Sequence, residues 1–188
     1  DLDLFGKCAL PALLTSLSKI EGIEWIRVLY LYPERLSDEI IDTFANNDKI
    51  VNYMDIPIQH CNSDILRRMN RRGSKEELTA LITKIREKIP DVVLRTTLIT
   101  GFPGETEEQF SELSEFVKEM KFDRLGCFAY SQEEGTPAAR MLNRVDTEEA
   151  QRRAELVMEI QTQVMDEFND SRMGDTVEVL CDGYDVQA

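Results

Sequence analysis

Short, almost continuous apolar runs alternate along the chain with longer segments in which apolar residues recur every three or four positions. Four of the runs are rich in β-branched and aromatic residues: IRVLYLY at 26–32, YMDIPI at 53–58, VVLRTTLI at 92–99 and RLGCFAY at 124–130. Near-continuous hydrophobicity, unlike strict alternation, is typical of strands buried on both faces of a parallel sheet. The pattern therefore predicts four parallel strands.

Helical periodicity fills the segments between these runs. Capping residues mark three helix starts: Ser37 before two acidic residues, Ser74 with Glu77, and Thr106 with Gln109. Each helix is expected to bury an apolar stripe, and the clearest stripes are Leu78, Leu81, Ile82, Ile85 and Ile89, then Phe110, Leu113, Val117 and Met120. Pro11 and the leucines after it predict one more helix, ahead of the first strand.

Alternating strands and helices place the chain in the α/β class, either as an open doubly wound sheet or as part of a barrel. After Asn143 one long amphipathic helix is expected, and Gly174 ends it. The run DTVEVLCDG then predicts a further strand, the start of a second, small β domain. We expect sequence to be missing at both ends, and we divide the chain into a barrel core (1–145), a linker helix (146–173) and the start of the β domain (174–188).

Composition narrows the classes of partner. The chain has 188 residues, with 36 acidic against 22 basic side chains and a net charge of −14. Because phosphate backbones are bound by positive surface, this balance argues against direct nucleic-acid binding. The four cysteines are far apart, so no metal ligands are assigned; each is expected to be a buried structural thiol in a reducing cytosol. No apolar stretch approaches the roughly 18 residues of a membrane span.

Polar and glycine-rich residues follow the predicted strands, at the edge where α/β proteins bind ligands. In LRTTLITGFPGET the third strand ends in glycines, which let a ligand approach the backbone closely. His60, the only histidine, follows the second strand; we favour a hydrogen-bonding role for it over that of a catalytic base. The sequence contains no Ser/His/Asp set and no Walker-type loop, so no catalytic residue is assigned.

Three segments in order, DIPIQHCNSDILRRMNRRG, LRTTLITGFPGETEEQF and FDRLGCFAYSQEEGTPAARM, resemble the methylthiotransferase family of radical S-adenosylmethionine enzymes. GFPGE alone is a weak signature, but the three motifs at these spacings are strong. PIQH, LRTT and YSQEEGT resemble the branch that modifies a ribosomal protein. The tRNA-modifying branch typically has PVQSGS-like and YSPR-like stretches in place of the first and last of these.

The resemblance implies a fold and a reaction. The fold would be a partial, TIM-like (β/α)6 barrel, of which this chain carries the last four units, followed by a long helix and the first strand of a truncated TRAM-type domain. The reaction would add a methylthio group to the β-carbon of an aspartate in ribosomal protein S12. Its cofactors would be S-adenosyl-L-methionine and two [4Fe-4S] clusters, whose ligands lie outside this chain, so the fragment alone is expected to be inactive. The partner would be S12 or the small ribosomal subunit, in the cytoplasm and not at a membrane.

Six residues are expected to bind the cofactor: Gln59, Arg71, Thr97, Ile99, Gly101 and Tyr130. Residues 97, 99 and 101 share one face of a strand of period two; Thr97 would meet the ribose and Ile99 the adenine. Arg71 would grip the α-carboxylate, because it follows Gln59 at the spacing that related radical enzymes use for this role. The alternatives are ordinary barrel filling for the strand residues, and one solvated or tRNA-facing patch for Arg71 with its arginine neighbours.

Glu133 and Glu134 are expected to bind substrate, because a carboxylate pair at the barrel mouth would orient a cationic ribosomal protein; a solvated turn is the alternative. Two other functions stay open. One is a tRNA methylthiotransferase, favoured by the four arginines of RRMNRR and opposed by the net charge. The other is a barrel module without catalysis.

Overall fold

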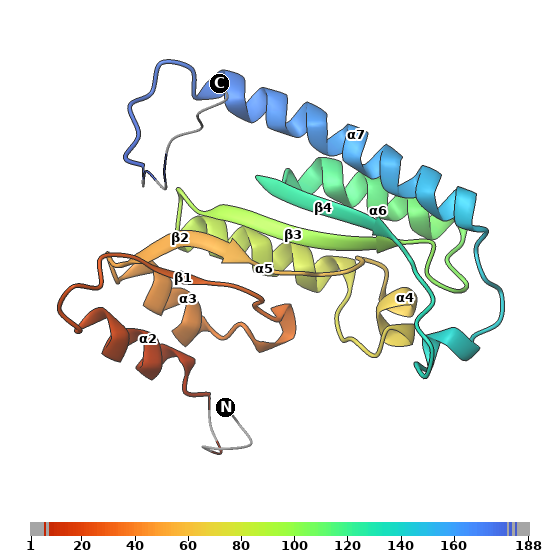
Figure 1. Cartoon of the computed structure of the whole chain (residues 1–188), viewed down its shortest axis with the longest axis horizontal. Coiled ribbons are helices and arrows are strands. Elements are labelled where there is room, and N and C mark those ends of the chain that lie inside the picture. Colours follow the sequence, from red (N-terminus) through yellow and green to blue (C-terminus); the bar gives the residue numbers. More distant parts are fainter. Residues whose placement is uncertain (1–5, 7, 180, 182, 184–188) are drawn as a thin grey trace.

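A parallel four-stranded sheet in the order β1-β2-β3-β4 forms the centre of the molecule (Figure 1). The computed structural model describes residues 6, 8–179, 181 and 183. The strands are β1 (Ile26–Val28), β2 (Ile50–Asp55), β3 (Val93–Thr100) and β4 (Arg124–Ala129). The helices are α2 (Leu10–Ser18), α3 (Asp38–Ala45), α4 (Ser63–Arg68), α5 (Lys75–Lys88), α6 (Glu107–Met120) and α7 (Thr147–Ser171), with 3-10 turns η1 (Pro33–Arg35) and η2 (Ala138–Arg140). The predicted α/β class and the four parallel strands are confirmed.

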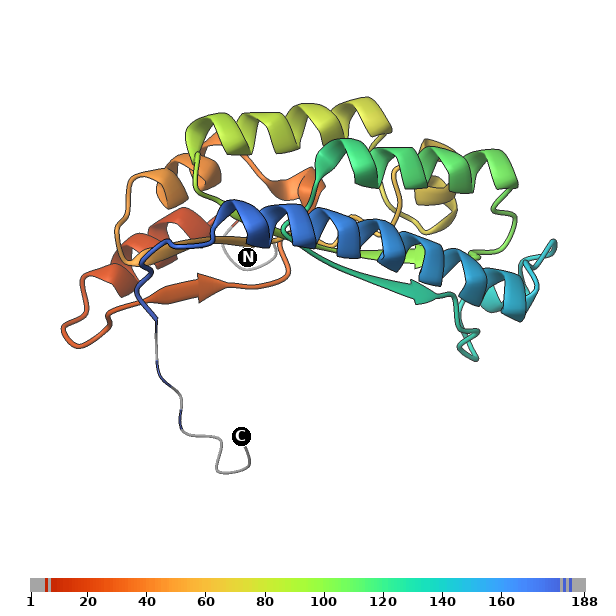
Figure 2. The same ribbon diagram turned by 90° about the horizontal axis from the view of Figure 1, so that it is seen from above.

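Helices cover one face of the sheet. Figure 2 shows α5, α6 and α7 on the same side, and α7 packs on β3, β4 and α6. Along β3 the even-numbered residues from Leu94 to Thr100 are buried beneath these helices, whereas Arg95, Thr97 and Ile99 are partly exposed. The expectation of burial on both faces is therefore wrong for the described residues. The residues 94–99 are LRTTLI, and their alternation places polar side chains on the open face.

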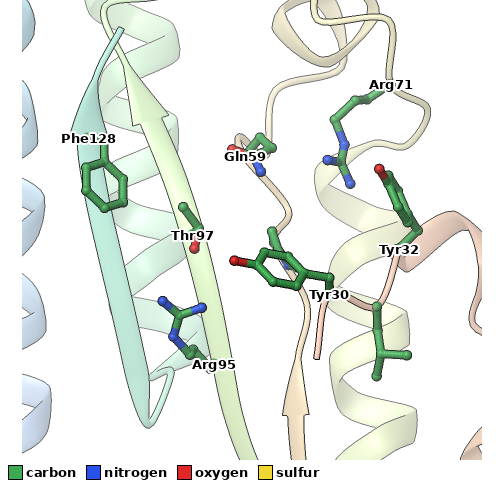
Figure 3. Close-up of a pocket in the computed structure, with 9 residues that line it drawn as sticks. Tyr30, Tyr32, Gln59, Arg71, Arg95, Thr97 and Phe128 are labelled. Atoms are coloured by element: carbon green, nitrogen blue, oxygen red, sulfur yellow. The ribbon is translucent and has the colours of Figure 1, made fainter. Parts of the chain in front are cut away.

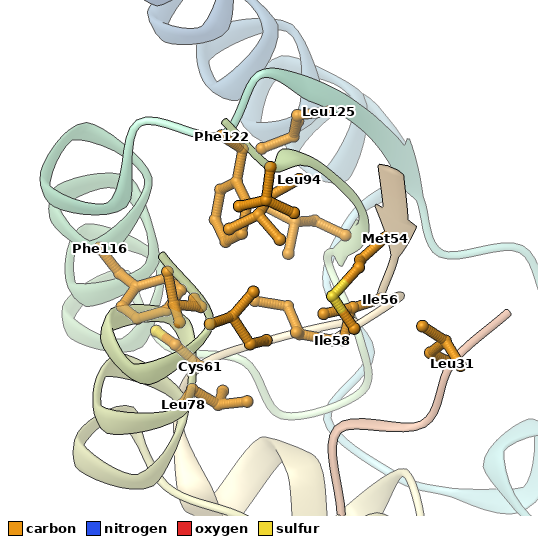
Figure 4. Packing of buried hydrophobic residues seen from close by; sticks show 14 of the residues in the cluster. Leu31, Met54, Ile56, Ile58, Cys61, Leu78, Leu94, Phe116, Phe122 and Leu125 are labelled. Atoms are coloured by element: carbon orange, nitrogen blue, oxygen red, sulfur yellow. The ribbon is translucent and has the colours of Figure 1, made fainter. Parts of the chain in front are cut away.

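The core lies between the sheet and its helices (Figure 4). Large apolar side chains from every layer meet there, among them Met54, Ile58, Leu94, Phe116 and Phe122. Full burial of such a side chain stabilises the fold by about 1.5–3 kcal/mol. The predicted stripes of α5 and α6 supply much of this cluster. On the open face of β3, Arg95 and Thr97 stay outside this cluster, and that leaves their polar side chains available for ligands.

The predicted helix starts are confirmed. The side chains of Ser37, Ser74 and Thr106 accept N–H groups in the first turns of α3, α5 and α6. In α6 the capping box is complete, since Gln109 also accepts the backbone N–H of Thr106. Asp146 caps α7 in the same way, and this helix is the predicted long amphipathic one. No helix in the described part of the chain is long and apolar enough to cross a membrane.

The predicted ends of the first two strands are wrong. The second strand was expected over 53–58, whereas β2 spans Ile50–Asp55. The first strand was expected to reach residue 32, but β1 stops at Val28, and Tyr30 turns the chain by adopting a left-handed conformation with φ 60°. Helix α4 ends through Asn70 (φ 57°): Asn70 N–H donates to Arg67 O at 3.1 Å and Arg71 N–H to Leu66 O at 2.8 Å. These two bonds form a Schellman motif, which fixes the backbone of Arg71 directly after the helix.

The strand predicted for DTVEVLCDG is not formed in residues 175–179, and residues 180, 182 and 184–188 of the proposed TRAM segment lie outside the described residues. The division of the chain into a barrel core, a linker helix and a further β domain stays a prediction.

Candidate functional site

A cavity of about 290 Å³ lies on the open face of the sheet, at the ends of β1 and β2 and against β3 (Figure 3). Its lining residues are Tyr30, Leu31, Tyr32, Pro57, Gln59, Arg71, Arg95, Thr97 and Phe128. The carboxyl ends of parallel strands are where α/β folds place their ligands. The structure therefore brings together three of the six residues expected to bind a cofactor, namely Gln59, Arg71 and Thr97.

The other three expected cofactor residues lie near the cavity but do not line it. Ile99 follows Thr97 on the same face of β3 and is aligned with Phe128 of β4. Gly101 is buried just after β3, and Tyr130 packs edge-on against Phe102, with ring centroids 5.2 Å apart. The Tyr130 hydroxyl is buried and has no hydrogen-bond partner among the described residues. A ligand that covers these residues would have to extend along β3, beyond the cavity.

Gln59 is held in a strained backbone conformation. Its φ is 69°, its N–H donates to Thr97 O at 2.9 Å, and its carbonyl accepts the N–H of Ile99 at 2.9 Å. A left-handed residue other than glycine costs roughly 1–2 kcal/mol. Such strain clusters at functional sites. Here it docks the end of the β2 segment against β3, which places the Gln59 amide in the cavity wall.

Arg71 points an unused donor toward the cavity. Its guanidinium lies 5.2 Å from the centroid of the Tyr32 ring, and its Nη2 is 3.6 Å from Glu34 Oε2. Nη2 is buried and makes no hydrogen bond within the described structure. Because a buried donor without a partner is costly, this atom calls for an acceptor. A carboxylate is the chemistry that a guanidinium fork fits best.

The neighbouring arginines do not share this position. Arg67 pairs with Asp64 in solvent, and Arg68 donates to Pro103 O at 3.3 Å. Arg72 lines a second cavity together with Glu34 of η1 and Glu77 of α5. The four arginines of RRMNRR thus point to different surroundings, and the alternative of one shared arginine patch does not fit this arrangement.

A second guanidinium in the cavity was missed by the sequence analysis. Arg95 Nη1 donates to Asp55 Oδ1 at 2.8 Å, and this hydrogen bond raises the pKa of Arg95. The other Asp55 oxygen accepts the N–H of Tyr30 at 3.4 Å. Arg95 lies two residues before Thr97, so the period-two argument that selected residues 97, 99 and 101 would also have selected it.

The glutamate of GFPGE is a buried anchor. Glu105 accepts the N–H of Gly101 at 2.7 Å and pairs with Arg153 Nη1 of α7 at 2.8 Å and with His60 Nε2 at 3.1 Å. His60 Nδ1 accepts the N–H of Asn62, so Nε2 carries the proton that points at Glu105. The expected hydrogen-bonding role of His60 is confirmed.

Electrostatics and close packing hold this anchor in place. Burial alone raises the pKa of Glu105, but the hydrogen bonds from His60, Arg153 and the Gly101 N–H outweigh it, and the pKa lies below the ordinary value of 4.5. At Gly101 (φ 70°) an added Cβ would lie 2.2 Å from the Cβ of Ala150, so α7 can approach this closely only because the residue is glycine.

The described residues contain no group of three His, Cys, Asp or Glu side chains that could hold a metal ion. Burial raises the pKa of Cys61 and Cys127 to about 12, so both thiols stay protonated. Cys8 and Cys181 are exposed, contrary to the expectation that every cysteine is buried. The described residues therefore offer no ligand set for an iron–sulfur cluster.

A family model for the radical SAM superfamily matches residues 9–117, which is more than half of the chain. The chain belongs to the radical SAM superfamily. The superfamily fold also recurs in solved structures: HemN, the coproporphyrinogen III oxidase of Escherichia coli, superposes with a TM-score of 0.67 at 22% identity, over 82% of this chain and 37% of that chain. TsrM, a radical S-adenosylmethionine methyltransferase from Kitasatospora setae, superposes with a TM-score of 0.56 at 16% identity, over 69% of this chain and 26% of that chain. These likenesses support a partial TIM-like barrel.

Among curated radical SAM relatives, the "Ribosomal protein uS12 methylthiotransferase RimO" of Lachnoclostridium phytofermentans is 52% identical over 99% of this chain, and that of Clostridioides difficile is 51% identical over 95%. The chain spans 42% and 40% of the length of these two proteins. S-adenosylmethionine has a methionyl carboxylate, a ribose and an adenine. The Arg71 donor that lacks a hydrogen bond in the described structure, the Gln59 amide and the Thr97 hydroxyl fit such a ligand in one radical SAM cavity.

We expect Arg153→Met to lower the free energy of unfolding by about 3 kcal/mol near neutral pH, because it leaves Glu105 charged and buried without its cation. The depressed pKa of Glu105 sets the pH dependence: its stabilisation is present above the unfolded-state pKa of about 4.3 and is lost as pH falls through the folded-state value. The difference between the two proteins in urea denaturation should therefore shrink in acid. Arg152→Met is the matched control, because Arg152 is exposed and pairs only with Glu149 in the described structure. Equal effects of the two changes would contradict the anchor.

Proposed function

We propose that the complete protein containing this chain is a radical SAM methylthiotransferase that methylthiolates the β-carbon of an aspartate in ribosomal protein S12. The observation that carries the proposal is the 52% identity to a uS12 methylthiotransferase over 99% of this chain. The cavity supports it, because its wall offers donors for a carboxylate and for hydroxyl groups but no paired acid and base. Hydrogen removal from carbon by a radical needs no such pair.

S-adenosylmethionine supplies the methyl group and the radical chemistry when it is bound, together with two proposed [4Fe-4S] clusters held elsewhere in the protein. This chain binds and orients the cofactor. Arg71 holds the α-carboxylate, Thr97 and Gln59 meet the ribose, and Ile99 packs on the adenine. Tyr130 is assigned to the same ligand beyond the cavity. Gly101 faces Ala150 of α7, so any contact of Gly101 with the cofactor would be made by its backbone. Tight positioning keeps the reacting carbon of the substrate next to the cofactor and excludes water from it.

The substrate side of the proposal rests on the loop after β4. Glu133 and Glu134 are exposed in this loop, between β4 and η2. We assign them to the docking of a cationic partner in the cytoplasm, either ribosomal protein S12 itself or the small ribosomal subunit. A tRNA substrate is disfavoured, because the net charge is −14 and the arginines that would support it point to different surroundings.

The direct test uses the full-length protein with its clusters reconstituted. Incubation with S-adenosylmethionine, a reductant and ribosomal protein S12 should add the mass of one methylthio group to a single aspartate, as located by peptide mass spectrometry. Unmodified S12 together with modified tRNA would instead assign the protein to the tRNA branch.

Arg71→Ala should weaken S-adenosylmethionine binding about ten- to hundredfold, because it removes a charge-assisted bond of about 1.5–3 kcal/mol. The measurement is equilibrium titration of the cluster-loaded protein. Arg72→Ala removes the same charge one residue away and should bind the cofactor nearly normally. Arg68→Ala is also expected to keep most of its affinity, although Arg68 contacts the carbonyl of Pro103. If all three variants, or none, lose affinity, Arg71 is not the carboxylate clamp.

Reversal of both charges by Glu133→Lys and Glu134→Lys should slow association with S12 about tenfold at low ionic strength, and it should reduce the salt dependence of the rate. Stopped-flow association measures both. Glu21→Lys with Glu24→Lys changes the net charge equally at the opposite end of the strands and serves as the control. If the Glu133→Lys, Glu134→Lys variant associates with S12 at the wild-type rate, the two glutamates belong to an ordinary solvated turn and do not bind substrate.

A further inference from the structure

Two guanidinium groups line the cavity of an acidic chain. The lining residues include Arg71 and Arg95 and no carboxylate, whereas the whole chain has 36 acidic and 22 basic residues. The carboxylates of Glu34 and Asp55 pair with these arginines from outside the lining. Figure 3 shows the two guanidinium groups apart from each other, with Gln59, Thr97 and Tyr30 between them. One cation suffices for the carboxylate of the cofactor. The second, Arg95, has no role in cofactor binding as proposed above.

The Arg95 guanidinium is bonded to Asp55 on one side, and its other side is open to a ligand. Asp55 is almost fully buried and receives Nη1 at 2.8 Å, whereas the Arg95 side chain is 36% exposed. A guanidinium carries five N–H donors in a rigid fork. The described contacts use one of them, and Asp55 fixes the plane of the rest. A fork that is fixed in advance loses little rotamer entropy when it binds a carboxylate.

Neighbouring hydroxyls extend this donor group. Thr97 lies two residues along the same face of β3. In Figure 3 the hydroxyl of Tyr30 points toward Thr97, above the Arg95 guanidinium. The left-handed backbone of Tyr30 (φ 60°) and the bond from its N–H to Asp55 place it there. The Asp55–Arg95 pair therefore orders two residues of the cavity wall, Arg95 and Tyr30.

We propose that Arg95, oriented by Asp55, binds the side-chain carboxylate of the protein substrate and so selects an aspartate at the reacting position. This inference rests on the proposed function. The ion pair with Asp55 offsets part of the Arg95 charge, so Arg95 binds the substrate carboxylate with moderate affinity. Moderate affinity allows the modified protein to dissociate after the reaction.

The experiment compares two unmodified peptides with the sequence of the S12 loop that contains the reacting residue. One peptide has aspartate at that position and the other has asparagine. Dissociation constants are measured by fluorescence anisotropy on the full-length, cluster-loaded protein with S-adenosylmethionine bound and without reductant. The key variant combines Arg95→Met with Asp55→Asn, because this pair of changes removes the guanidinium without leaving a buried charge unpaired. Arg27→Met is the control; Arg27 lies on β1, stacks 3.8 Å over the Tyr53 ring and does not line the cavity.

The wild type and the control should bind the aspartate peptide more tightly than the asparagine peptide. The double variant should lose about ten- to hundredfold in affinity for the aspartate peptide, and its affinities for the asparagine peptide and for S-adenosylmethionine should change little. Arg95→Lys keeps a positive charge beside Asp55 but lacks the guanidinium fork, so its loss of affinity for the aspartate peptide should be intermediate. This variant still tests the proposal if the double variant folds poorly.

Two results would overturn the inference in different ways. If the wild type prefers aspartate and the folded Arg95 variants keep the same preference, Arg95 is only a structural partner of Asp55, while the proposed function stands. If the wild type binds neither peptide and does not modify S12, the proposed substrate itself is wrong, and the role of Arg95 falls with it.

Discussion

The buried carboxylate of Glu105 is the interaction on which the architecture of the site depends. A charged group far from water is tolerated only when hydrogen bonds and a counter-ion replace its hydration. Glu105 obtains these from three distant segments: His60 after β2, the Gly101 N–H after β3 and Arg153 in α7. None of the three could move away without leaving that charge unsatisfied. The two loops that border the candidate cofactor site are thereby tied to each other and to the long helix.

The two faces of the sheet have different roles, and the Glu105 network belongs to the buried face. The helices, the apolar core and the Glu105 network lie on one side, where they fix the loops. The other side carries Arg95, Thr97 and Gln59, whose polar groups face the cavity. The backbone strain at Gln59 is sustained because its N–H and C=O are both bonded to β3. The buried side thus supplies the rigidity that positions donors on the open side.

Local chemistry made much of this structure predictable from sequence. The caps at Ser37, Ser74 and Thr106 depend on residues three positions apart, and the choice of Thr97 depends only on strand periodicity. The features that were missed depend on contacts between distant residues. Arg153 and Glu105 are 48 residues apart, and nothing local marks them as partners. The left-handed residue Tyr30 follows the end of β1, and its N–H bonds to Asp55, 25 residues away. The end of α4 at Asn70 is by contrast local, because its two capping bonds join residues three and five positions apart.

The charges of the outer surface and of the cavity would act on a substrate one after the other, first during its approach and then during its binding. The outer surface is acidic and attracts cations over roughly a Debye length, about 8–10 Å at physiological salt. The cavity differs, because two guanidinium groups line it. Each has a carboxylate beside it, Glu34 for Arg71 and Asp55 for Arg95, but both keep N–H donors for an anionic group. A nucleic acid would be repelled at the first step despite the arginines inside. A cationic protein would be attracted, and only a chain that presents an anionic side chain would then be held at the second step. On the proposed function, a basic ribosomal protein with a reactive aspartate satisfies both conditions.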